Sequence, residues 1–127
     1  MCSSDLYCVE HHFAGLKRLL NDNAKANQIR SAIETNNIEN APLENRQKTA
    51  MEYARKLTNN PGSIREESIE KLRADGFTDG EILEINQVCA YFSYANRTVL
   101  GLGCSTKGDI LGLSPNNNHD PNDWGHS

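Results

Sequence analysis

The sequence predicts an all-α fold, and three observations support this prediction. Apolar residues recur at steps of three and four along most of the first 103 positions, which is the period of an amphipathic helix. Thr78 and Glu81 form a capping-box pattern, in which each side chain satisfies a free backbone N–H group at a helix start. No segment shows the clear alternation of apolar and polar residues that a half-buried strand needs.

The first two helices are expected over residues 6–20 and 24–35. Ser3, Ser4 and Asp5 provide side-chain oxygens that suit the cap of the first helix, and Asn21–Asn23 ends it. The apolar stripe of this helix consists of Leu6, Val9, Phe13, Leu16 and Leu20.

Three further helices are expected downstream. The third runs from Pro42, a residue tolerated in a first helical turn, to Thr58, with its apolar face formed by Leu43, Ala50, Ala54 and Leu57. After the stop signal Asn59–Gly62, a short helix runs from Ser63 or Ile64 to Ala74. The last helix begins at Thr78 and reaches about Leu100, where Gly101 and Gly103 end it; its apolar stripe is Ile82, Ile85, Cys89 and Phe92.

An irregular tail is expected after this helical domain. We divide the chain into a helical domain over residues 1–103 and a tail over 104–127, which is rich in Asn, Asp, Pro and Gly. A short apolar patch and a lone Trp124 suggest that the tail packs on the domain or on a neighbouring subunit. Its polar residues are interpreted as loop residues rather than metal ligands: His119, Asp120, Asp123 and His126.

Composition excludes several classes of protein. The 127 residues carry 13 Lys and Arg against 17 Asp and Glu, a net charge of -4, which argues against bulk nucleic-acid binding. No apolar run is long enough to span a membrane, and the first residues lack the features of a signal peptide. We therefore expect a cytoplasmic protein. With 37% hydrophobic residues, its core is small, and we expect it to bury further surface in a homo-oligomer.

The densest group of chemically active residues lies at the start of the chain. Cys8 falls in the first turn of the first predicted helix, where the helix dipole favours a thiolate. His12 lies one turn further on the same face, so a thiolate and an imidazole are in reach of each other. Tyr7, Glu10 and His11 are possible proton carriers or supporting residues beside them.

Structural roles compete with these chemical ones. Free cysteines are often buried as small apolar residues, and this interpretation is open for Cys8 from spacing alone. It is the one we favour for Cys89, whereas Cys104, which follows two glycines, could be exposed. Glu10 fits an exposed charge as well as a relay group. Cys2, Cys8, His11 and His12 are ligand types for zinc, but adjacent histidines point about 100° apart on a helix. We therefore predict no metal and no cofactor.

The sequence Tyr7–His12 resembles the active-site segment of the AhpD-like alkylhydroperoxidases, in the carboxymuconolactone decarboxylase superfamily. It is most similar to the uncharacterised peroxidase-related branch, whose members show a Tyr-Cys-x-x-His-His string. The resemblance covers most of the chain and continues in five later segments: Phe77–Ile85, Ala90–Phe92, Asn96–Arg97, Gly101–Gly103 and Gly108–Pro115.

This resemblance implies an AhpD-like helical bundle, built around the 6–20 and 78–100 helices, and a thiol-dependent peroxidase. Cys8 matches the family cysteine that attacks the peroxide, and His12 matches the histidine that serves in proton transfer or thiolate activation. The family typically forms oligomers. Two features of the family pattern are missing, because Asp5 stands at the position of the first, resolving cysteine and no residue matches an upstream carboxylate.

The two departures from the family pattern affect how the catalytic cycle could be completed. The segment that precedes the motif in the family is expected to be missing here. Cys2 is a possible resolving thiol only if residues 1–5 fold back, because six residues of helix rise about 9 Å; otherwise an external thiol reductant is needed. Two alternatives to a peroxidase are a catalytically impaired oligomeric family member and a non-redox enzyme of the lactone-decarboxylase type.

Overall fold

The computed structural model describes residues 6–104 and 107, and the side chains of all of these except residues 6–8 and 11. This part of the chain is all-α and contains no strand, which confirms the predicted fold class. Its helices are α1 (Leu6–Leu20), α2 (Asn23–Glu34), η1 (Ile38–Asn40), α3 (Asn45–Asn59), η2 (Pro61–Ser63), α4 (Glu66–Ala74) and α5 (Asp79–Leu102), where η marks a short 3-10 helix. Residues 108–127, to which most of the predicted tail belongs, lie outside the described residues.

The first two helices agree closely with the prediction. α1 has the expected bounds. α2 begins at Asn23 rather than at residue 24, because the Asp22 side chain accepts a hydrogen bond of 2.9 Å from the Lys25 backbone N–H and so caps the helix. Asn21 precedes this cap with a φ of 48°, a left-handed conformation that asparagine tolerates better than most residues.

The predicted start of α3 at Pro42 is wrong. Ala41, which precedes the proline, has an extended backbone, as steric contact with a proline ring requires. The helix begins at Asn45, where the Glu44 backbone N–H donates to Oε1 of Gln47 at 3.0 Å. The proline therefore shapes the turn before the helix rather than its first turn. α4 likewise begins later than predicted, at Glu66, because η2 occupies Pro61–Ser63.

The predicted buried face of α3 is also wrong in part. Thr49 and Tyr53 are its buried residues, whereas Ala50 and Ala54 are only half-buried and Leu43 precedes the helix. Burial of these polar side chains is possible because each has a hydrogen-bond partner. The Thr49 hydroxyl donates to the Asp75 carboxylate, and Nδ2 of Asn86 donates to the Tyr53 hydroxyl at 3.0 Å.

The main apolar cluster joins α3, α4 and α5. Leu72 of α4 is fully buried, and Tyr53 of α3 and Ile82 of α5 pack around it. Half-buried apolar side chains complete this cluster: Leu57, Ile64, Ile69, Phe77 and Ile85. This cluster therefore lies at the α4 end of the molecule. The other buried apolar side chains lie on α2, on η1 and directly after η1: Ala26, Ile29, Ala32, Ile38 and Ala41.

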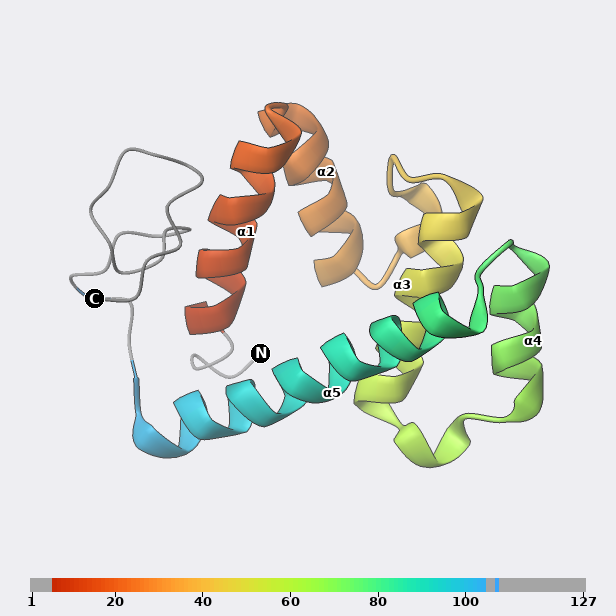
Figure 1. Ribbon diagram of the computed structural model, residues 1–127. Helices are drawn as coiled ribbons and strands as arrows, with labels where there is room; N and C mark the ends of the chain where they lie inside the picture. The colour runs from red at the N-terminus through yellow and green to blue at the C-terminus, as the bar shows by residue number, and fades with distance from the viewer. Residues whose placement is uncertain (1–5, 105–106, 108–127) are drawn as a thin grey trace.

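α5 links the two ends of the molecule. Figure 1 shows that it runs from the α4 end, past α3, to the side of the N-terminal end of α1. Thr78 caps its start through the predicted capping box, and Gly103, with a φ of 66°, ends it in the left-handed conformation typical of a helix terminus. Gly101, predicted to share this role, lies inside the helix.

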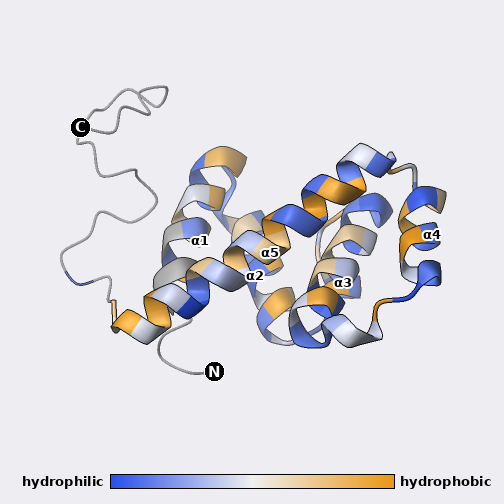
Figure 2. Ribbon diagram, turned by 60° about the horizontal axis from the view of Figure 1, so that its bottom comes forward, coloured by the Kyte–Doolittle hydropathy of each residue, from blue (hydrophilic) through white to orange (hydrophobic). Residues whose placement is uncertain are grey.

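From Val88 to Leu102, α5 carries apolar side chains on its solvent-exposed side, called here its open side, as well as on its packed side. Val88, Tyr91, Tyr94 and Leu102 are all more than half exposed, at 54%, 61%, 69% and 76%. Figure 2 shows apolar residues spread along this helix. No helix in the described part of the chain combines the length and the apolar character that crossing a membrane requires.

Candidate functional site

The first turn of α1 holds the predicted nucleophile. The backbone of Cys8 occupies the third position of this helix, so it lies among the free N–H groups of the N-terminal turn. The positive end of the helix dipole there stabilises a negative charge, which is the condition for a thiolate. His12 follows one helical turn later and is exposed. The described backbone therefore has the helical register that the Cys8–His12 prediction requires.

The imidazole of His12 contacts α5. Its ring stands edge-on to the ring of Phe92, with centroids 4.5 Å apart and planes at 82°. This is a favourable geometry for two aromatic rings, because the positive edge of one faces the negative face of the other. Phe92 in turn is edge-on to Tyr91 at 5.4 Å. The contact therefore gives His12 a defined position between α1 and α5.

Glu10 lies on another side of α1 and is paired with α2. Nη2 of Arg30 donates to Oε1 of Glu10 at 2.8 Å, and Nε of Arg30 donates to Glu34 at 2.7 Å. The hydrogen bonds to Glu34 and then to Glu10 raise the pKa of Arg30, so the guanidinium remains charged. The ionised carboxylate of Glu10 accepts this hydrogen bond and has no proton of its own to donate. Glu10 thus has a structural role in joining α1 to α2, and the interpretation of it as a plain exposed charge is wrong.

Cationic groups surround Phe13, the next apolar residue of α1. The Lys17 ammonium lies 4.5 Å and the Arg30 guanidinium 4.7 Å from the centre of its ring. Both distances are within the range of cation–π interactions. The α1–α2 contact therefore combines ionic and aromatic interactions, and it supports the helix that carries Cys8.

The remaining members of the predicted site are described only in part. Tyr7 and His11 lie on α1, and their side chains, like that of Cys8, lie outside the described residues. Cys2 and Asp5 lie outside them entirely. The roles predicted for Tyr7, His11 and Cys2 therefore remain predictions.

The two later cysteines differ in exposure. Cys89 of α5 is half-buried, and burial raises the pKa of its thiol. A thiol in this environment is a poor nucleophile, which agrees with the structural role predicted for it. Cys104 is exposed. Among residues 9–104 with described side chains, no three His, Cys, Asp or Glu residues come together as a group that could hold a metal ion.

Sequence reasoning missed the partners that position the site. Arg30 was not singled out, although its spacing of four from Glu34 on one helix is a signal for an ion pair. Its bond to Glu10 joins two helices and has no local sequence signal. Phe92 belongs to the apolar stripe predicted for the last helix, but nothing in the sequence indicates that His12 contacts it.

Neither a protein-family model nor a curated protein matches this chain.

Proposed function

We propose that this protein is a thiol-dependent peroxidase-like oxidoreductase of the AhpD-like type, with Cys8 as nucleophile and His12 as its proton partner. The observation that carries the proposal is the register of α1, which puts Cys8 in the first turn of the helix and His12 one turn later. The His12–Phe92 contact supports it, because it holds the imidazole at the junction of the two helices that the resemblance makes central.

The proposed reaction begins with the thiolate of Cys8. Its sulfur attacks the terminal, hydroxyl-bearing oxygen of a hydroperoxide ROOH, and the O–O bond breaks as the S–O bond forms. The leaving alkoxide takes a proton from the His12 imidazolium and departs as the alcohol ROH. The sulfur is oxidised by two electrons to a sulfenic acid, and the peroxide is reduced.

A second thiol completes the cycle. The sulfenic acid condenses with this thiol, which forms a disulfide and releases water. Cys2 is the intramolecular candidate and a small external thiol is the other. Reduction of the disulfide by two further thiols regenerates Cys8. Such a cycle fits a cytoplasmic location, where thiols remain reduced.

The proposal includes assembly as a homo-oligomer. The open side of α5 supports this part, since Val88, Tyr91, Tyr94 and Leu102 leave apolar surface there that a second copy would cover. No charged residue lies on α5 between Glu84 and Arg97, so two such faces meet without burying like charges at their centre. The tail over 104–127 is proposed to pack on the domain or on the neighbouring subunit.

A catalytically impaired family member is the second candidate. Two observations favour it: Asp5 replaces the resolving cysteine, and the carboxylate of Glu10 is engaged by Arg30 rather than free to relay protons. A non-redox enzyme of the lactone-decarboxylase type is the third, and its activity would survive the loss of Cys8.

Consumption of an alkyl hydroperoxide with dithiothreitol as the reductant tests the proposal. The wild type and Cys104→Ser, which changes an exposed thiol, are expected to consume peroxide at the same rate. Cys8→Ser is expected to lower this rate to that of buffer with dithiothreitol. Equal rates for the wild type and Cys8→Ser would refute the peroxidase assignment.

A further inference from the structure

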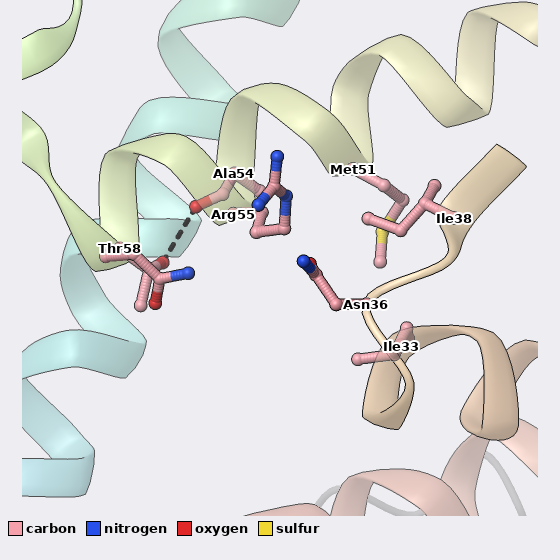
Figure 3. A pocket seen from close by; sticks show the side chains of 8 residues that line it. Ile33, Asn36, Ile38, Met51, Ala54, Arg55 and Thr58 are labelled. Carbon is pink, nitrogen blue, oxygen red and sulfur yellow. Dashed lines mark hydrogen bonds between the residues drawn. The ribbon is translucent and has the colours of Figure 1, made fainter.

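A pocket lies between the end of α2, η1 and the outer face of α3, and it shares no residue with the Cys8–His12 site. It is open to solvent and has a volume of about 490 Å³, which is within the usual range of about 300–1,000 Å³ for small-molecule sites. Figure 3 shows the side chains that line it, among them Ile33, Asn36, Ile38, Met51, Arg55 and Thr58. The pocket thus combines an apolar end and a polar end.

The apolar end consists of Ile33, Ile38 and Met51. The side chain of Ile38 is buried. The side chain of Ile33 lines the same pocket but remains 48% exposed. Contact with an aliphatic chain would remove this surface from water, which is favourable in proportion to the area covered. This end of the pocket therefore suits a hydrocarbon tail.

The polar end holds a cation. Arg55 donates from Nε at 3.2 Å and from Nη2 at 2.7 Å to the same carboxylate oxygen of Glu52. A guanidinium has five N–H donors, so three remain for a second acceptor. No Asp or Glu lines the pocket itself, and Arg55 is the charged residue of its wall. Although Glu52 already pairs with Arg55, the unused N–H donors of the guanidinium suit an anionic ligand group.

Asn36 brings an amide to the same pocket from a fixed backbone. Its φ of 55° is left-handed, and two hydrogen bonds hold the turn, from its own N–H to Ile33 at 3.1 Å and from the Asn37 N–H to Ala32 at 2.7 Å. Figure 3 shows its side chain directed toward the centre of the pocket. The Thr58 hydroxyl already donates to the Ala54 carbonyl at 2.8 Å. Arg55 and Asn36 are thus the donors suited to an anion.

We propose that this pocket binds a medium-chain aliphatic monocarboxylate, with its carboxylate on Arg55 and Asn36 and its chain on Ile33, Ile38 and Met51. A monocarboxylate matches the single cation, because a guanidinium recognises a carboxylate through parallel N–H bonds. The aliphatic chain matches the apolar end. The neutral alcohol and the cationic amine of the same chain length lack the group that Arg55 recognises.

Titration with octanoate, observed through the methyl group of Met51, tests this inference. The sequence contains two methionines, Met1 and Met51, so methionine-methyl labelling gives a simple spectrum in which Met51→Leu assigns the pocket signal. We expect octanoate to shift this signal saturably. Octylamine is expected to leave it unchanged, and octanol is expected to bind about tenfold more weakly, since a charge-assisted bond is lost.

Three variants test the polar end. Arg55→Gln is expected to weaken octanoate binding about tenfold. Glu52→Gln is expected to strengthen it, because it removes the carboxylate that competes for Arg55. Asn36→Gly is expected to weaken it about threefold, through the loss of one neutral hydrogen bond. Asn21→Gly is the matched control, because it changes the other left-handed asparagine, outside the pocket, and is expected to bind as the wild type does.

A saturable shift that Arg55→Gln weakens would establish the inference. An unchanged Met51 signal at millimolar octanoate would overturn it. Equal affinities for octanoate, octanol and octylamine would overturn it too, since they would show an apolar hollow without carboxylate recognition. All of these measurements are independent of Cys8, so they separate this inference from the proposed peroxidase activity.

Discussion

The imidazole of His12 is held edge-on against the phenyl ring of Phe92, with 4.5 Å between the ring centres. This contact connects two helices that are far apart in the sequence, and it lies one turn of α1 beyond Cys8. Phe92 belongs to α5 and touches the proposed proton partner, so it is a positioning residue rather than a catalytic one. Phe92 is therefore the link between the fold and the proposed chemistry.

A double-mutant cycle measures this link. We expect His12 and Phe92 to be coupled by about 0.5–1.5 kcal/mol in the free energy of unfolding, the range for aromatic pairs. The cycle uses His12→Ala and Phe92→Leu, singly and together, with urea denaturation as the measurement. A second cycle between His12 and the exposed Tyr94 is the control, and its coupling is expected to be close to zero. Equal coupling in both cycles would contradict the structural contact.

Glu10→Gln tests whether Glu10 relays protons. We expect this variant to lose at most about 1 kcal/mol of stability, because the half-exposed pair with Arg30 is partly screened by water. Its rate of peroxide consumption is expected to equal that of the wild type. Glu34→Gln, which removes the other partner of Arg30, is the matched control. A drop of about a hundredfold confined to Glu10→Gln would instead assign general acid–base catalysis to Glu10.

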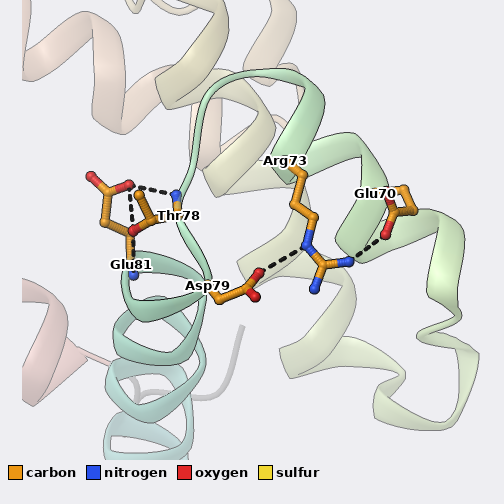
Figure 4. A network of polar contacts seen from close by, with 5 residues as sticks. All are labelled: Glu70, Arg73, Thr78, Asp79 and Glu81. Carbon is orange, nitrogen blue, oxygen red and sulfur yellow. Dashed lines mark hydrogen bonds and ion pairs between the residues drawn. The ribbon is translucent and has the colours of Figure 1, made fainter.

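Glu81 makes the stability of the α5 start depend on pH. Its carboxylate accepts a hydrogen bond from the Thr78 backbone N–H at 2.8 Å and one from Arg46 at 2.6 Å, and these bonds lower its pKa from 4.5 to about 2. Figure 4 shows the contacts with Thr78 beside the separate network of Arg73, Glu70 and Asp79. Because the folded state binds this proton less tightly, the stabilisation is complete above about pH 4.5 and is lost as the pH falls toward 2.

The expected result is a gap between the wild type and Glu81→Gln that depends on pH. The wild type should melt at the higher temperature at pH 7, and the two melting temperatures should converge between pH 4.5 and pH 2. Glu84→Gln, an exposed glutamate on the same helix, is the control and is expected to follow the wild type. A gap that stays constant down to pH 2 would show that Glu81 does not act through its charge.

Leu72 tests the position of the apolar cluster between α3, α4 and α5. Because it is 0% exposed, Leu72→Ala is expected to cost about 2–5 kcal/mol of unfolding free energy in urea denaturation. Leu72→Met nearly conserves the side-chain volume and is expected to cost less than about 1.5 kcal/mol, which keeps the test informative if the alanine variant fails to fold. Leu83→Ala is the exposed control on α5 and is expected to cost about 0.5 kcal/mol or less.

Sequence patterns predicted the number and order of the main helices, because caps and apolar spacing are local signals. The Thr78–Glu81 capping box correctly identified Thr78 as the cap of α5, and the helix begins one residue later, at Asp79. Pro42 misled the prediction of α3, because a proline is compatible with both a first helical turn and the turn before it. Thr49 and Tyr53 were missed as buried residues because their partners, Asp75 and Asn86, lie on other segments.

In the candidate site, too, the sequence predicts local spacing but not the contacts between helices. The spacing of Cys8 and His12 on one helix face follows from the sequence alone. The contacts of His12 with Phe92 and of Glu10 with Arg30 depend on how α1 packs, and no local pattern predicts them. The pocket beside Arg55 also arises from packing, since its walls come from α2, η1 and α3.

The most direct test of the central claim is site-resolved detection of sulfenic acid after one equivalent of alkyl hydroperoxide. The protein is trapped with a dimedone-type probe, digested and analysed by mass spectrometry, with the half-buried Cys89 as an internal reference. We predict that the probe labels Cys8 and not Cys89, and that His12→Ala slows the labelling of Cys8. Labelling of Cys8 that never exceeds that of Cys89 would contradict the account.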